Sequence, residues 1–136
     1  MPAIRPLHLF GAIGAALLAS PVAAQKYTTG GALNSCVERM YTDMSFNVAT
    51  QGGVLSFRNR CNQRISITYC AIGGSDGCFE TDVSPGRIGQ TQYNRREERD
   101  AGGVIAYPCP DGYLPVDSND DNVRGGPAIR YRCKSL

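Results

Sequence analysis

The sequence predicts a mainly β protein: a small, disulfide-stapled antiparallel β-sandwich or barrel with a short helix near its N-terminus. Three observations lead to this prediction. Short segments alternate apolar and polar residues with the period of a half-buried strand, glycine and proline are frequent between them, and six cysteines are spread along the chain. A chain of 136 residues has room for one core, so we expect a single domain.

Residues 1–24 have the composition of a secretory signal peptide. Arg5 precedes an apolar run that ends at Ala19, and small residues at positions 22 and 24 mark a cleavage site before Gln25. A membrane anchor is the weaker interpretation, because a spanning helix needs about 20 uninterrupted apolar residues. We therefore expect an exported protein, secreted or periplasmic and not membrane-spanning, whose single domain covers residues 25–136.

The cysteines indicate three disulfides, because an even number in an exported chain is typical of a disulfide framework. All six lie after the leader, and none forms the CxxC spacing of a zinc site. Cys70 and Cys78 flank the glycine-rich segment "AIGGSDG" and are expected to pair. For the other two bridges we predict Cys61 with Cys109 and Cys36 with Cys133.

The segment from residue 33 to residue 44 is ambiguous between helix and strand. Apolar residues from Leu33 to Met44 recur at helical spacing, and Ser35 with Glu38 has the pattern of a capping box. We predict a short helix here. The alternative is a strand that begins at Cys36, because several residues after it favour β structure.

The stretch "FRNRCNQRISITYC", residues 57–70, predicts two strands with one apolar face each. A three-residue loop, 62–64, would form a hairpin that pairs Phe57 with Tyr69 and places the apolar residues on one side. Otherwise the second strand crosses to another sheet.

Further strands are predicted along the rest of the chain. Residues 79–83 alternate and are followed by "SPGR", which has proline and glycine where a type II turn requires them. Residues 88–93, 104–109 and 129–134 are the remaining strands, and the charged segment "NRREERDAGG" connects two of them.

The residue types make catalysis improbable, so we predict a protein that is not an enzyme. The only histidine, His8, lies in the leader, which excludes the usual Ser-His and Cys-His machinery from residues 25–136. Glu97 and Glu98 are the remaining acid candidates, but a run of mixed charge is more often a solvated surface. The acidic segment 117–122 resembles part of a calcium loop, yet lacks its turn glycine and its bidentate glutamate, so we favour an ordinary surface loop and expect no metal and no cofactor.

The basic residues suggest the binding role. Without Arg5, the exported part has 13 Lys and Arg against 12 Asp and Glu, a net charge of +1 that does not favour nucleic acid. Arginine forks suit carboxylate, sulfate and phosphate. If the two strands that carry them are neighbours, their outward side chains form one basic stripe: Arg58, Arg60, Arg130, Arg132 and Lys134.

Two functions follow from these observations. The first is an exported, non-enzymatic binding or interaction module, with an anionic glycan, a lipid head group or a protein as partner. The alternative is a small secreted enzyme inhibitor that presents a rigid loop near residues 95–102.

Overall fold

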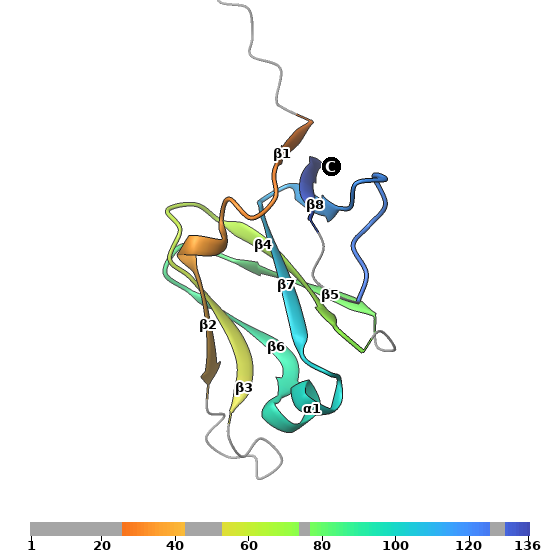
Figure 1. The fold of residues 1–136 in the computed structure, drawn as a ribbon. Helices are drawn as coiled ribbons and strands as arrows, with labels where there is room; N and C mark the ends of the chain where they lie inside the picture. Colours follow the sequence, from red (N-terminus) through yellow and green to blue (C-terminus); the bar gives the residue numbers. More distant parts are fainter. Residues whose placement is uncertain (1–25, 43–52, 74–76, 126–129) are drawn as a thin grey trace, which may run out of the picture.

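The computed structural model describes residues 26–42, 53–73, 77–125 and 130–136, so the predicted leader lies outside the described part (Figure 1). Described are nine strands, a 3₁₀ turn and one short helix. The elements are β1 (Tyr27–Thr29), η1 (Asn34–Cys36), β2 (Val37–Thr42), β3 (Val54–Asn59), β4 (Ile65–Ala71), β5 (Cys78–Val83), β6 (Ile88–Asn94), α1 (Arg95–Asp100), β7 (Val104–Pro110), β8 (Tyr113–Val116) and β9 (Arg132–Ser135).

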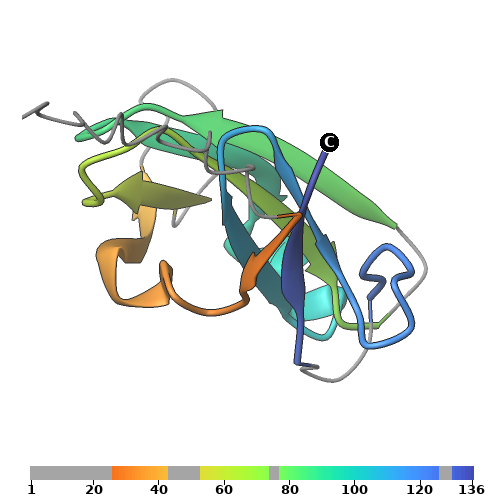
Figure 2. The same ribbon diagram turned by 90° about the horizontal axis from the view of Figure 1, so that it is seen from above.

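The strands form three antiparallel sheets, which confirms the predicted mainly β class. Their strand orders are β2-β3-β6, β5-β4-β7 and β1-β9-β8. Viewed from above, the N-terminal strand (orange) lies beside the C-terminal strand (dark blue), as the pairing of Thr28 with Cys133 requires (Figure 2). No helix among the described residues has the length and apolar character to span a bilayer.

The main core lies between the first two sheets, which makes the fold sandwich-like. Leu55 and Phe57 of β3 pack there with Ile65, Ile67 and Tyr69 of β4, all nearly inaccessible to solvent. A smaller cluster, centred on Cys70, Tyr107 and Val123, covers the other face of β4 and β7. Partly buried Tyr131, just before β9, packs against it, so the third sheet sits over that face.

The chain crosses from one sheet to another after β3, so the predicted hairpin of residues 57–70 does not form. β3 pairs with β2 and β6, whereas β4 pairs with β5 and β7. The alternative, a crossing to another sheet, is confirmed. Phe57 and Tyr69 still meet, with ring centroids 6.3 Å apart, but they do so across the core rather than within one sheet. Both arrangements bury the same apolar faces, and alternation alone therefore does not distinguish them.

The "SPGR" turn is a second crossing at the same end of the sandwich. Arg87 N donates to Ser84 O over 3.1 Å, and Gly86 has φ of +74°, as the predicted type II turn requires. The turn leads from β5 in one sheet to β6 in the other.

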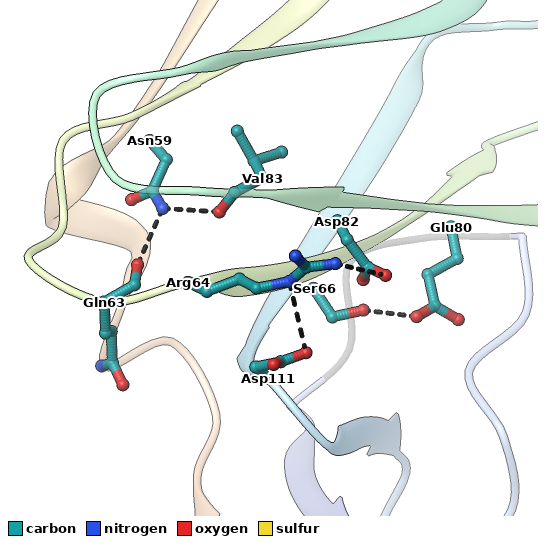
Figure 3. Close-up of polar contacts among 8 residues, drawn as sticks. All are labelled: Asn59, Gln63, Arg64, Ser66, Glu80, Asp82, Val83 and Asp111. Carbon is teal, nitrogen blue, oxygen red and sulfur yellow. Dashed lines mark hydrogen bonds and ion pairs between the residues drawn. The ribbon is translucent and has the colours of Figure 1, made fainter.

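The buried side chain of Asn59 connects the two crossings (Figure 3). Its amide nitrogen donates to Gln63 O and Val83 O, each over 2.8 Å, and its oxygen accepts from Cys61 N. The Asn59 backbone also bonds to Gly86 and Arg87. The side chain of one asparagine thus bonds to backbone groups of the first crossing and of the end of β5.

The predicted N-terminal helix is wrong, and the strand alternative is correct. Residues 34–36 form a 3₁₀ turn, and β2 pairs with β3 over its full length, while Met44 lies outside the described residues. Val37 and Tyr41 are four residues apart, a spacing that places them on one helical face but equally on one face of a strand. Glu38 faces Arg58 across the strands instead of capping a helix.

The disulfide between Cys70 and Cys78 is confirmed, and the two residues lie directly opposite each other on β4 and β5. The other two predicted pairings, Cys61 with Cys109 and Cys36 with Cys133, are wrong. Cys36 bonds to Cys61, because β2 begins where its partner β3 ends. Cys109 bonds to Cys133, because β9 covers the face of β7 from which Cys109 projects.

Candidate functional site

Arg58 of β3 and Arg60, just after it, do not present free charge. Arg60 lies 2.7 Å from the Glu38 carboxylate and Arg58 lies 3.9 Å from it. Glu38 and Arg58 lie opposite each other on the paired strands β2 and β3, and all three side chains are partly exposed. The predicted binding residues Arg58 and Arg60 therefore share one local counter-charge.

The basic residues of β9 also meet an acid. Lys134 Nζ lies 2.6 Å from Asp120, and Arg132 lies 3.6 Å from the same carboxylate. The Tyr27 hydroxyl donates to Asp120 as well. These bonds, first those from Lys134 and Tyr27, lower the pKa of Asp120, while the bond to Asp120 raises the pKa of Lys134.

A continuous basic stripe does not form within the described part of the chain. β3 and β9 belong to different sheets and share no strand pairing. In Figure 1, β3 lies at the lower left, whereas the C-terminal strand lies at the top beside β8. The five predicted residues thus divide into two groups, of which Arg58 and Arg60 form one.

Arg130 and Arg132 of the second group border a hollow, whereas Lys134 does not line it. We call it the basic hollow, and its lining residues are Ser118, Arg130, Tyr131 and Arg132. Its volume is about 260 Å³. Arg130 is exposed, and none of the described carboxylates lies within 4.0 Å of it. Two guanidinium groups and one hydroxyl around one hollow are donors that suit an oxyanion.

Tyr131, which lies between Arg130 and Arg132 in the sequence, is held in place by its neighbours. Tyr131 OH donates to Pro108 O over 3.0 Å, and its ring stacks edge-on against Tyr107 at 5.1 Å. Burial raises the pKa of Tyr131, which keeps its hydroxyl protonated as a donor. Gly30 approaches so closely that a Cβ there would lie 1.7 Å from Tyr131 O, so only glycine fits.

Arg132 is held by an aromatic ring and by the disulfide of the residue that follows it. Its guanidinium carbon lies 4.2 Å from the centroid of the Tyr27 ring, within the range of a cation–π contact. The adjacent Cys133 is bonded to Cys109 of β7. The position of this side chain is therefore largely set before any ligand arrives.

The charged segment 95–102 contains helix α1 and not an extended loop. Asn94 caps the helix by accepting from Glu97 N over 2.8 Å, and the Glu97 carboxylate in turn accepts from Asn94 N over 3.1 Å. Glu98 is buried and forms an ion pair with Arg39 and a hydrogen bond with the Tyr41 hydroxyl. Its carboxylate anchors α1 to β2.

The acidic loop 117–122 is organised by its own backbone. Asp117 accepts from Asn119 N and Asp121 N over 2.8 and 3.0 Å, and Asp120 pairs with β9 as described above. In the described ranges no three Asp, Glu, Cys or His side chains gather as metal ligands would.

Sequence reasoning missed a second concave feature, the groove between β5 and the loop that follows β8. We call it the β5 groove, and it encloses about 170 Å³. Its lining residues are Thr68, Cys78, Glu80, Leu114, Pro115, Asn122 and Val123. Strand alternation indicates that Thr68 and Glu80 face one way, but only the tertiary fold places the loop over them.

Comparisons of the chain with protein-family models, with curated proteins and with solved structures found no match.

Proposed function

We propose that the protein is an exported, non-enzymatic binding module that takes an anionic group of an envelope or extracellular ligand in the basic hollow. The observation that carries the proposal is Arg130: an exposed guanidinium without a described carboxylate partner, beside Arg132 and the Ser118 hydroxyl. Arginine binds carboxylate, sulfate and phosphate through paired N–H donors.

The division of the basic residues supports this assignment over a binding role for β3. Arg58 and Arg60 share Glu38, so an incoming anion would have to displace an existing ion pair there. At the basic hollow, Asp120 sits nearer to Lys134 than to Arg132. Arg130 is therefore the predicted binding residue without a described carboxylate partner, and Arg132 beside it shares its carboxylate with the closer Lys134.

Export is supported by the cysteines and by the leader. Three disulfides join all six cysteines, which is typical of proteins in an oxidising compartment. The signal peptide predicted over residues 1–24 accounts for delivery to the periplasm or the medium.

The inhibitor alternative loses its main support. An inhibitory loop is expected to enter an enzyme's cleft in a preorganised conformation, and this alternative placed such a loop at residues 95–102. Residues 95–100 are helical and tied to β2 through Glu98. Arg39 also donates to Val104 O over 2.8 Å, which fixes the end of the connection.

The experiment is a titration of the purified protein with dextran sulfate and with inorganic polyphosphate, using uncharged dextran as the control. We expect salt-sensitive binding to both polyanions and none to dextran, and a weaker affinity in Arg130→Gln. Equal binding by Arg130→Gln and the wild type would refute the site. A substrate screen covers catalysis: turnover of a glycan, ester or peptide that Glu97→Gln or Glu98→Gln abolishes would make the protein an enzyme.

A further inference from the structure

We infer that the β5 groove receives a single lysine side chain of a partner protein. This inference goes beyond the proposed anion site, because the groove shares no lining residue with the basic hollow. The inference rests on the shape of the groove, on the hydrogen bond that Glu80 already accepts and on the ion pairs of the neighbouring carboxylates.

The groove has the size and lining for one long side chain. Sites for drug-sized ligands enclose about 300–1,000 Å³, whereas this groove holds about 170 Å³. Leu114, Pro115 and Val123 form an apolar wall against which a methylene stem can pack. Glu80 and Asn122 supply polar atoms at the same groove. A cationic group on an apolar stem matches this combination.

Glu80 is the carboxylate with an unmet charge on this face of β5 (Figure 3). Its neighbour Asp82 lies 3.5 Å from Arg64, which also approaches Asp111 at 3.7 Å. By contrast, no basic side chain in the described part of the chain lies within 4.0 Å of Glu80. An incoming cation therefore competes with an existing pair at Asp82 but not at Glu80.

The surroundings of the Glu80 carboxylate favour a lysine over an arginine as its partner. Ser66, itself buried, donates its hydroxyl to Glu80 Oε1 over 2.5 Å. One lone pair of that oxygen is thus occupied, and the planar guanidinium of an arginine needs more room than a lysine ammonium in a groove of about 170 Å³. A lysine ammonium is a compact point charge that one oxygen can accommodate.

The walls of the groove are fixed before a ligand arrives. The Cys70–Cys78 disulfide closes one end of β5, and the Cys78 sulfur lies 3.5 Å from Val123 O. On the opposite wall, Asn122 forms a β-bridge with Val116, and Val123 N donates to Pro115 O over 3.4 Å. Preorganised walls reduce the entropy that binding costs.

The test is an NMR titration of the purified protein with Nα-acetyl-lysine N-methylamide. The norleucine analogue, which keeps the stem without the charge, and the arginine analogue serve as comparisons. We expect the lysine probe to shift the amide signals of Thr68, Glu80, Asn122 and Val123. The norleucine probe should bind roughly fivefold more weakly, the factor of a surface ion pair, and the bulkier arginine probe should also bind more weakly than lysine.

Two variants separate the groove from general surface charge. Glu80→Gln should weaken the lysine probe roughly fivefold, whereas Asp82→Asn, on the same strand and face, should bind it within about twofold of the wild type. Wild-type affinity in Glu80→Gln, equal binding of the norleucine probe, or shifts confined to residues outside the groove would each overturn the inference. None of these outcomes depends on whether polyanions bind the basic hollow.

Discussion

The Asn59 side chain donates a 2.8 Å hydrogen bond to Val83 O and thereby joins β3 of one sheet to the end of β5 in the other. The same nitrogen donates to Gln63 O, so both crossings between the sheets depend on one residue that is inaccessible to solvent. Asparagine is suited to this position because it carries two donors and an acceptor on a short side chain.

Replacing Asn59 should therefore destabilise the whole sandwich. Asn59→Ala leaves Val83 O without its donor and removes the acceptor of Cys61 N, and each buried orphan costs about 1–3 kcal/mol. We expect urea unfolding to show a loss of about 2–5 kcal/mol. Gln63→Ala is the control, because only its backbone takes part. A loss below about 1 kcal/mol in Asn59→Ala would contradict this role.

Breaking the Cys109–Cys133 disulfide should loosen the third sheet more than the main core. The bridge closes a separation of 24 residues, for which chain entropy predicts about 3–4 kcal/mol. In the double variant Cys109→Ser, Cys133→Ser, we expect faster amide hydrogen exchange in β8 and β9, with protection retained in β3 and β4. Uniform loss of protection would show that the third sheet is not a separable layer. Non-reducing peptide mapping of the wild type checks the pairing itself.

The Asp120–Lys134 pair predicts how stability depends on pH. The pKa of Asp120 is lowered by hydrogen bonds from Lys134 and Tyr27, so the folded carboxyl stays ionised below its ordinary value of 3.8. Its contribution is present above that value and is lost as the pH falls through the lowered pKa. The pKa of Lys134 is raised above 10.5, so its contribution is present below 10.5 and is lost at still higher pH.

An NMR pH titration of the Asp120 carboxyl checks this prediction. We expect a midpoint below the ordinary value of 3.8 in the wild type, and a midpoint closer to that value in Lys134→Gln. An Asp120 midpoint unchanged by Lys134→Gln would contradict the assigned cause.

Local patterns in the sequence predicted the local features of the fold. Alternation placed Ile65, Ile67 and Tyr69 on one buried face, and a glycine-rich segment between Cys70 and Cys78 indicated the short disulfide. "SPGR" predicted its own turn because proline and glycine fix the backbone angles there.

Features that depend on the order of strands in space could not be predicted in this way. Alternation states which side of a strand is apolar, but not which strand lies beside it, so the crossing after β3 remained one of two alternatives. The pairings of Cys36 and Cys109 follow from that crossing and from the position of β9. For the same reason, the sequence indicated basic side chains but not that Glu38 and Asp120 lie against most of them.

We propose that the position of Arg130 and Arg132, and not the net charge of the protein, determines anion binding. The most direct test compares two double variants that lose the same charge. The first combines Arg130→Gln with Arg132→Gln, and the second combines Arg58→Gln with Arg60→Gln. Affinity for polyphosphate is measured for each over a range of salt concentrations. We predict that the first variant loses most of the binding and that its dependence of log K on log salt concentration falls by about 1–2, while the second variant stays close to the wild type. Equal losses in both variants would contradict the account, because they would mean that the polyanion responds to overall charge alone.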